Sequence, residues 1–370
     1  AVNSHEASAD LPNAKNATVA SDVPQANIAQ SQTTDATAPV NQQLISVQTD
    51  LYHIWINPKG GDIVRIELLS HDKSKDSDQP FVMLENDAKR TYVAQSGLIG
   101  LNGPDSSRGG RPLYAVEKTS YTLADAKGVQ DQKGQSEKVL NVPMVFKTPE
   151  GVEIIKTFTF TQGQYPIVVK HQVINRSQQS WQGQMFGQLK RDNSEDPGKS
   201  SQGIFTLGTF LGGAWGTPDA HYNKLKFANF SEEKVNTEAK GGWVAIVQHY
   251  FVSAWIPGNL KLTQANGQPY VAKLESRQSA DHMNIIGFTS PVINVPAGTS
   301  MEVDAKLYSG PKVQSELKDL AVGLNQTVDY GWLWPIAKLL FLGLQFFHSI
   351  VGNWGWSIIL LTIMVKMILW

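Results

Sequence analysis

The C-terminal 39 residues, 332–370, constrain this chain more than any other segment. They include two lysines and one histidine, but no aspartate or glutamate. Within them, residues 354–370 form an apolar run of 17 residues that is interrupted only by Ser357, Thr362 and Lys366. A helix that spans a bilayer needs about 20 apolar residues. We therefore expect residues 354–370 to be a truncated transmembrane helix whose remainder lies beyond the last residue.

Residues 332–351 have a different pattern, in which a narrow polar stripe runs beside a broad apolar face. On a helix, Lys338, Gln345 and Ser349 fall on one side, and leucine and phenylalanine side chains cover most of the rest. Such a helix suits the interface between lipid and water. Tryptophans at headgroup depth are typical of membrane proteins. The predicted interfacial anchors are Trp332, Trp334, Trp354 and Trp356. The alternative is a buried helical hairpin of a soluble domain.

The composition excludes several classes of function. The net charge is −1, whereas a nucleic-acid-binding protein usually carries a basic patch or a high pI. The chain has no cysteine, which excludes disulfides, thiol catalysis and zinc–thiolate sites together. We expect no nucleic-acid partner, no cofactor and no metal ion. Because the chain begins at Ala1 rather than Met, we also expect a missing upstream segment, which could include a first membrane anchor.

The first 43 residues differ in composition from everything that follows. They are mostly Ala, Ser, Thr, Asn, Gln and Asp, with scattered Pro and hardly any large apolar side chains. Such a segment cannot bury enough apolar surface to offset the entropy that ordering would cost. We expect residues 1–43 to be a disordered linker.

From residue 44 to about residue 310 the sequence predicts β-structure. Short runs of alternating apolar and polar residues are separated by Gly and Pro, as in residues 148–151 between two runs. Many strands at short spacing indicate a sandwich or barrel, and a domain of this length favours a large two-sheet sandwich. The expected strands are 46–56, 62–69, 143–147, 152–161, 165–175, 242–256, 283–289 and 300–308.

Two segments near this domain need separate interpretation. Residues 203–216 are rich in glycine and aromatic residues, and they could be a loop that approaches a ligand or, more commonly, a strand edge. Residues 312–324 space Val313, Leu317 and Leu320 at intervals of three and four, which predicts an amphipathic helix. This helix would connect the β domain to the apolar C-terminal part. We assign residues 311–325 to this connecting segment.

Several stretches together resemble one protein family. They are QSGLIGLNGPD (95–105), RPLY (111–114), KGGWVA (240–245), AWIP (254–257), TVDYGWLW (327–334) and VGNWGWSI (351–358). The chain is similar, over nearly all of residues 44–370, to the YidC/Oxa1/Alb3 family of membrane insertases as found in Gram-negative bacteria. The last two motifs are the most specific ones.

The resemblance implies a mainly β fold, with a galactose-mutarotase-like β-supersandwich in the periplasm at residues 44–310. Residues 1–43 would be a periplasmic linker, 332–351 an interfacial helix, and 354–370 the start of the insertase core. The protein would be a multi-pass inner (cytoplasmic) membrane protein with residues 1 to about 350 on the periplasmic side. It would assist insertion, folding and assembly of membrane proteins without catalytic residues. The implied partners are nascent membrane proteins, the lipid bilayer and the Sec translocon with its SecDF accessory subunits.

The resemblance also gives Lys366 a role. In the family, an arginine of this helix lies in a hydrophilic groove that receives the substrate, and Lys366 stands at that position in WGWSIILLTIMVKMILW. Lysine keeps the charge but lacks the planar guanidinium. Independently, a charge within a spanning helix costs about 2.5–3.5 kcal/mol and usually faces a cavity or partner. The alternative is that Lys366 extends to the cytoplasmic headgroups.

The main alternative function is an anchored periplasmic carbohydrate-binding or mutarotase-like protein. Such chemistry needs a general acid and base, typically His with Glu or Asp. The candidate histidines are His53, His171, His221, His249 and His282. None has a specific spacing to a carboxylate, and we expect His171 and His249 to be hydrogen-bonded structural residues of strands. Trp215, Trp243 and Trp255 could line a sugar site, although aromatic residues of strands usually belong to the core.

A third interpretation makes the sandwich a docking module for another membrane component such as the Sec translocon. It is compatible with insertase function. The sequence does not identify the docking residues, although sheet edges and the helix at 312–324 are candidates.

Overall fold

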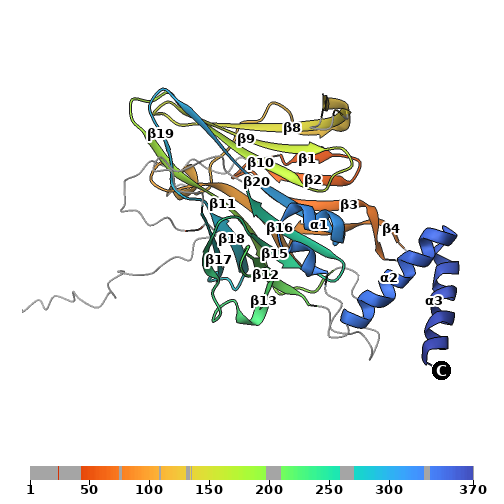
Figure 1. Ribbon diagram of the computed structural model, residues 1–370. Helices are drawn as coiled ribbons and strands as arrows, with labels where there is room; N and C mark the ends of the chain where they lie inside the picture. The colour runs from red at the N-terminus through yellow and green to blue at the C-terminus, as the bar shows by residue number, and fades with distance from the viewer. Residues whose placement is uncertain are drawn as a thin grey trace, which may run out of the picture.

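Two large β-sheets pack against each other, and helices follow at the C-terminal end (Figure 1). The computed structural model describes Pro24 and residues 43–74, 77–107, 110–130, 134, 136–196, 210–258, 271–328 and 334–369. The linker that we predicted at 1–43 therefore lies almost entirely outside the described residues.

The first sheet has 11 strands, and all but one of its pairings along the path are antiparallel. In spatial order they are β14 (Asn236–Ala239), β17 (Ala272–Gln278), β18 (Asn284–Thr289), β11 (Trp181–Arg191), β5 (Thr91–Ile99), β4 (Ser77–Asn86), β3 (Asp62–Ser74), β2 (Tyr52–Asn57), β1 (Ile45–Gln48) and β6 (Ser120–Thr122), with β19 (Ile293–Val295) paired to β11. The exception is β1, which runs parallel to β6.

The second sheet has nine strands. In spatial order they are β13 (Asn223–Lys226), β12 (Gly212–Gly216), β15 (Trp243–Val247), β16 (Phe251–Pro257), β20 (Ser300–Pro311), β10 (Ile167–Asn175), β9 (Val152–Thr161), β8 (Ser136–Lys147) and β7 (Lys127–Gln130). The predicted turn at 148–151 is confirmed, and Gly151 takes the left-handed φ of +95° there.

One hydrophobic core fills the space between the sheets. In β9 and β10, buried and half-buried residues alternate along the whole strand, as expected when one face of a sheet packs against another layer. Trp243 and Trp255 are fully buried in this core, and Trp215 packs against it. The three tryptophans that could have lined a sugar site are thus core residues.

Two expected strands were wrong in the same way, because each contains a turn. Residues 46–56 form β1 and β2, separated by a turn in which the Thr49 hydroxyl accepts the N–H of Tyr52 at 3.0 Å. Residues 242–256 form β15 and β16, and the Gln248 N–H bonds to the Phe251 carbonyl at 2.9 Å across their turn. Neither turn contains Gly or Pro, so the strongest sequence markers of a turn are missing.

Short helices connect the sandwich to the C-terminal pair. α1 covers Gln314–Leu320 only, because Ala321 is extended (φ −157°, ψ 148°). Gly323, with a φ of +81°, then leads into the 3₁₀ helix η4 (Leu324–Thr327). The predicted amphipathic helix at 312–324 is therefore shorter than expected. The remaining 3₁₀ helices are η1 (Pro104–Ser106), η2 (Leu123–Asp125) and η3 (Phe227–Asn229).

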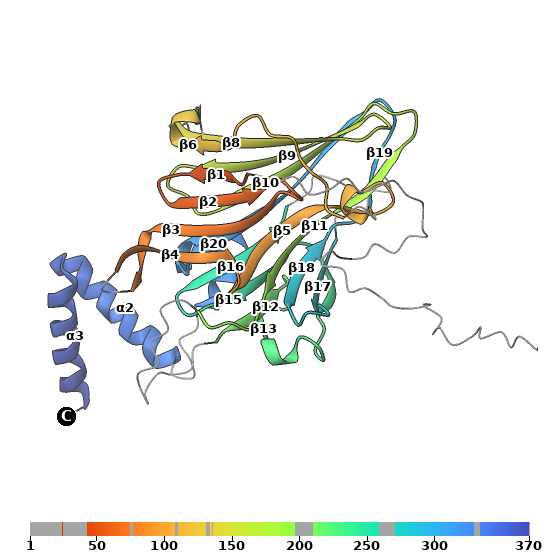
Figure 2. The ribbon, with the colours of Figure 1, turned by 180° about the vertical axis from the view of Figure 1, so that it is seen from behind.

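The chain ends in two longer helices, α2 (Trp334–Val351) and α3 (Trp354–Leu369). They project from the side of the sandwich toward which β3 and β4 extend, as both ribbon views show (Figures 1 and 2). Of the glycine-rich segment, residues 203–209 lie outside the described residues, whereas Gly212–Gly216 is strand β12.

Candidate functional site

A tight turn folds α2 and α3 into a helical hairpin. Gly352 ends α2 with a φ of +68°, and its N–H bonds to the His348 carbonyl at 2.8 Å, as is typical of a glycine that closes a helix. Asn353 then caps α3, because its side-chain oxygen accepts the N–H of Gly355 at 2.8 Å. The ring of His348 stacks on Trp354 with centroids 3.8 Å apart. The Gly-Asn pair between two apolar runs is therefore the local signal for the hairpin.

Large apolar side chains cover the outside of this hairpin. Among the side chains that the structure describes (339–351 of α2 and 354–368 of α3), seven are exposed on each helix: Leu339, Leu340, Phe341, Leu342, Phe346, Ile350 and Val351 on α2, and Trp354, Trp356, Ile358, Ile359, Ile363, Met367 and Ile368 on α3. A contiguous apolar surface of this kind is rare on soluble monomers and marks contact with protein or membrane. The hairpin is therefore the first candidate functional site.

Of the predicted site residues, the structure describes the side chains of Trp354, Trp356 and Lys366. Trp354 and Trp356 are 51% and 60% exposed at the start of α3. Trp332 lies outside the described residues, and Trp334 is the first residue of α2, of whose side chain nothing is described. The side chain of Lys366 is exposed 12 residues after Trp354, about 18 Å along the helix axis.

None of the helices in the described part of the chain is both long enough and apolar enough to span a membrane.

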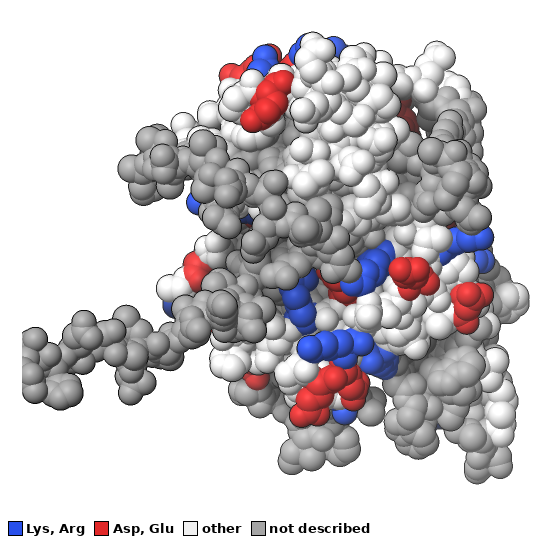
Figure 3. Space-filling view, turned by 90° about the vertical axis from the view of Figure 1, so that its left-hand side faces the viewer, with Lys and Arg blue, Asp and Glu red and all other residues white. Residues whose placement is uncertain are grey.

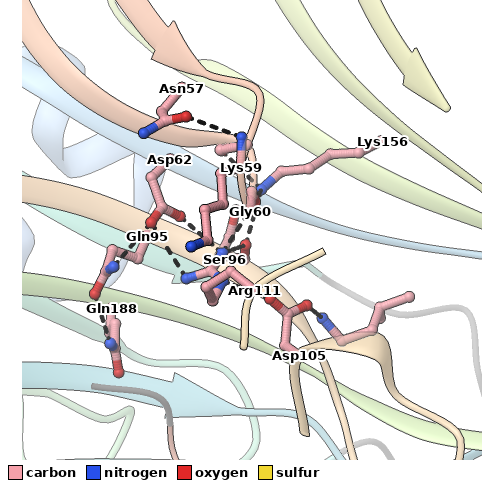
Figure 4. Close-up of polar contacts among 12 residues, drawn as sticks. Asn57, Lys59, Gly60, Asp62, Gln95, Ser96, Asp105, Arg111, Lys156 and Gln188 are labelled. Carbon is pink, nitrogen blue, oxygen red and sulfur yellow. Dashed lines mark hydrogen bonds and ion pairs between the residues drawn. The ribbon is translucent and has the colours of Figure 1, made fainter. Parts of the chain in front are cut away.

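A second candidate site lies inside the sandwich, where side chains form a continuous row of hydrogen bonds (Figure 4). Arg277 donates to the Gln188 side-chain oxygen at 2.8 Å, Gln188 donates to Gln95 at 2.9 Å, and Gln95 donates to Asp62 at 2.8 Å. The direction of each amide is fixed, because it accepts from one neighbour and donates to the next. We call these four residues, with Arg111, Asp105 and Lys156, the buried polar chain.

Arg111 links the carboxylates of the buried polar chain to the backbone. Its guanidinium lies 2.7 Å from Asp62 and 2.5 Å from Asp105, and it also donates to the carbonyls of Gly60 (2.9 Å) and Ser96 (2.8 Å). Burial raises the pKa of Asp105, while the Arg111 charge acts in the opposite direction. Five donors in a rigid plane suit this arrangement, which fixes the loop after β5 to the turn before β3.

Lys156 joins the second sheet to the same backbone atoms. Its side chain is fully buried, and its ammonium donates to the carbonyls of Gly60 and Gly61 at 2.9 Å and of Ser96 at 2.8 Å. Burial lowers the pKa of Lys156 to about 7, although the carboxylate of Asp62 opposes that shift. All three N–H donors of the charged form have acceptors.

No sequence pattern predicted the buried polar chain, although two of the family motifs contain parts of it. Gln95 and Asp105 are the first and last residues of QSGLIGLNGPD, and Arg111 opens RPLY. Their spacing carries no sign of a mutual contact, because the sheet register brings Gln95 to Gln188 and the loop after β5 returns Asp105 to β5. The ion pairs inside the core could therefore be identified only from the structure.

The described histidines do not assemble an acid–base site. His171 is fully buried in β10, and neither ring nitrogen has a hydrogen-bond partner among the described residues, so the expectation that it is hydrogen-bonded was wrong. His249 is exposed in the turn after β15 rather than in a strand. His53 approaches Glu67 at 3.8 Å, and its other ring nitrogen lies 2.9 Å from the Ser46 hydroxyl. Among the described residues, no three His, Asp or Glu side chains group as metal ligands.

A shallow hollow of about 430 Å³ lies over β3 and β4, beside His53 and Glu67. Its lining residues are Arg65, Glu67, Lys73, Gln79, Pro80, Val82 and Glu85. Arg65 pairs with Glu67 at 2.8 Å and with Glu85 at 2.7 Å, so both carboxylates are already engaged. On the face drawn in Figure 3, basic and acidic side chains are likewise intermingled.

The described residues thus form a large two-sheet β-sandwich joined to a helical hairpin with an exposed apolar surface. Residues 44–342 match the family described as the YidC periplasmic domain, and the chain belongs to that family.

Curated relatives have the same assignment. The membrane protein insertase YidC of Pseudomonas putida strain GB-1 is 44% identical over 346 residues, 93% of this chain and 58% of that protein. The protein of the same name from Pseudomonas aeruginosa strain PAO1 is 40% identical over 382 residues, 97% of this chain and 62% of that protein. The chain thus spans about three fifths of the length of these relatives.

Solved structures with a similar fold include proteins described as related to galactose mutarotase. A galactose mutarotase related enzyme from Lactobacillus acidophilus has a TM-score of 0.43 at 10% identity, over 72% of this chain and 97% of that one. A galactose mutarotase-like protein from Lactobacillus casei has a TM-score of 0.41 at 11% identity, over 72% of this chain and 99% of that one. Similarity at this level says nothing about activity.

Proposed function

We propose that this chain is the part of an inner-membrane protein insertase that carries its periplasmic sandwich and its first membrane-contacting helices. The single observation that carries the proposal is the α2–α3 hairpin, where seven of the described side chains on each helix are large, apolar and exposed. Burying such a surface in lipid is favourable by about 25 cal/mol per Å². The curated relatives, whose printed name is membrane protein insertase YidC, agree with this role.

In this proposal α2 lies along the periplasmic lipid interface and α3 enters the hydrocarbon. Trp354 and Trp356 anchor the start of α3 at headgroup depth, with Trp332 and Trp334 anchoring the other end of α2. Lys366 then lies about 18 Å deeper than Trp354, where it contributes a positive charge to a substrate groove. That charge lowers the barrier for polar, acidic flanks of a nascent membrane protein, which are costly in hydrocarbon.

The sandwich has an accessory role in this proposal, as a docking module for the Sec translocon and its SecDF subunits. No covalent chemistry is assigned to it. The polar side chains that could act as acid and base, such as Asp62, Glu67 and Glu85, are engaged by arginines at 2.7–2.8 Å. The carbohydrate alternative gains support from no contact in the described residues.

Insertion into vesicles depleted of the native insertase tests the groove. In the full-length protein, Lys366→Glu should slow insertion of a substrate with an acidic translocated tail by about tenfold or more, because a like charge replaces an attractive one. Lys366→Arg, which retains the charge, is the matched control and should insert normally. Equal insertion by the Glu and Arg variants would remove Lys366 from the groove.

Deletion of residues 50–300 in the same assay separates the two parts of the protein. We expect insertion to survive when residues from 312 onward are retained. Loss of insertion, with the shortened protein still embedded in the membrane, would instead assign substrate handling to the sandwich.

A further inference from the structure

The hollow over β3 and β4 lies where these two strands extend beyond the rest of their sheet. β2 pairs with β3 only as far as Leu68, so the end of β3 and the start of β4 continue as a two-stranded arm. Both ribbon views show this arm reaching toward α2 (Figures 1 and 2). Lys73, Gln79 and Pro80 of the arm line the hollow. The hollow is therefore on the side of the sandwich from which the helical hairpin projects.

Two glutamates contribute hydrogen-bond acceptors to the hollow. Arg65 donates to Oε1 of Glu67 from Nε at 2.9 Å and from Nη2 at 2.8 Å, and to Oε1 of Glu85 from Nη1 at 2.7 Å. Oε2 of each carboxylate is not used by Arg65. His53 approaches Oε2 of Glu67 only to 3.8 Å, and burial lowers the pKa of His53, so its ring is neutral at pH 7. Both carboxylates can therefore accept from a further cationic donor.

Lys73 contributes the opposite charge. It is exposed near the end of β3 and forms no ion pair with a described residue. Pro80 and Val82 add a small apolar surface to the lining. The volume of about 430 Å³ is in the range of small-molecule sites. Because acceptors of negative charge and a donor of positive charge line one hollow, the ligand that complements it carries both signs.

We propose that this hollow binds the zwitterionic headgroup of a phospholipid of the phosphoethanolamine type. The primary ammonium of the headgroup would donate to Oε2 of Glu67 and of Glu85, and its phosphate would pair with Lys73, since hydrogen bonds between charged groups are the stronger ones. A choline headgroup has no N–H on its ammonium and cannot make the same bonds. The inference rests on the proposed function, in which α2 lies at the lipid interface and the arm beside it lies at headgroup depth.

Phosphorus NMR of the chain in vesicles of equal parts phosphatidylethanolamine and phosphatidylcholine tests this site. The chain has no cysteine, so Ser74→Cys can carry a nitroxide label at the end of β3, next to the hollow but outside its lining. A nitroxide broadens the resonances of nearby phosphates, and it should broaden that of phosphatidylethanolamine more. The same label on Val129→Cys of β7 is the control and should broaden neither. Equal broadening of both lipids, or of neither, by the Ser74→Cys label would overturn the proposal.

Variants in the labelled chain locate the effect. Lys73→Gln should weaken headgroup binding by about two- to fivefold, as expected for the loss of an exposed ion pair. Glu67→Gln retains an oxygen for Arg65 but loses its charge, and it should remove the preference for phosphatidylethanolamine. Lys89→Gln is the matched control, because Lys89 is exposed and does not line the hollow. Unchanged broadening in both Lys73→Gln and Glu67→Gln would contradict the assignment.

Labels on α3 separate this inference from the proposed function. If an Ile363→Cys label lies in the hydrocarbon while the Ser74→Cys label broadens neither lipid, the hollow is not a headgroup site and the proposed function stands. An Ile363→Cys label in water would overturn the proposed function and this inference with it.

Discussion

At the scale of single residues, the sandwich core contains two basic side chains at positions where the alternating pattern of β9 and β10 predicts apolar ones. Lys156 and His171 are cross-strand neighbours on β9 and β10, and both are fully buried. Burial holds the pKa of His171 well below its usual range, and the nearby Lys156 charge lowers it further. Lys156 is tolerated because three carbonyls accept from its ammonium, and His171 is tolerated because it remains neutral.

The pH dependence of stability should report Lys156. Its pKa is about 7 in the folded state against 10.5 for an unburied lysine, so between these values the unfolded chain binds the proton more strongly. The free energy of unfolding should therefore rise with pH from about 7 to 9, by up to about 1.4 kcal/mol per unit. Lys156→Met should remove this rise, which urea titrations at several pH values would measure. Lys170, whose side chain is 40% exposed, gives the control Lys170→Met, and equal slopes in both variants would refute the prediction.

Sequence could not identify these residues as a site. In an alternating strand, a shift of the register by one residue turns every inward side chain outward. The sequence of β9 alone therefore does not show whether Lys156 points into the core. The partners of Lys156 are backbone carbonyls of Gly60, Gly61 and Ser96. Every residue has a backbone carbonyl, so the sequence does not reveal these partners. Only the pairing of distant strands brings them together.

At the scale of elements, the chain folds back after β5 so that Asp105 of η1 lies against Gly97 of β5. An ideal Cβ on Gly97 would lie 2.2 Å from a carboxylate oxygen of Asp105. That same carboxylate accepts the N–H of Leu98 at 2.8 Å and pairs with Arg111. Glycine at 97 therefore permits the buried polar chain to form.

Gly97→Ala should destabilise the sandwich. The added methyl group displaces Asp105 and breaks a buried ion pair, which costs about 3–5 kcal/mol. Gly128→Ala in β7 is the matched control, because nothing lies within 4 Å of its ideal Cβ, and it should change the free energy of unfolding by less than about 0.5 kcal/mol. Urea unfolding of both variants measures the difference, and a loss of stability below about 1 kcal/mol for Gly97→Ala would refute the tight packing.

Element boundaries were predictable where glycine or periodicity marked them. Gly151 between β8 and β9, and the Gly352-Asn353 pair between α2 and α3, correspond to turns in the structure. The turns within 46–56 and 242–256 were missed because side-chain hydrogen bonds and a short loop, rather than Gly or Pro, form them. Helix α1 is shorter than its apolar spacing predicted, since Ala321 takes an extended conformation.

At the scale of the whole molecule, one chain combines two parts suited to different solvents. The sandwich buries its apolar residues between two sheets, whereas α2 and α3 expose theirs. The mainly β fold and the apolar C-terminal segment were both predictable, because each extends over many residues and has a characteristic period. The contact between Arg191 and Tyr92 was not predictable, because only the register of β11 against β5 brings these two residues together.

Spin labelling in vesicles would show whether α3 enters the bilayer, and how deeply. The chain has no cysteine, so single substitutions Ile359→Cys and Ile363→Cys can carry nitroxide labels in vesicles, with Val129→Cys on the sandwich as the aqueous control. Both α3 labels should be accessible to oxygen rather than to a polar nickel complex, Ile363→Cys should lie deeper than Ile359→Cys, and Val129→Cys should be accessible to nickel. Nickel accessibility at all three positions would place α3 outside the bilayer and refute the proposed function of the hairpin.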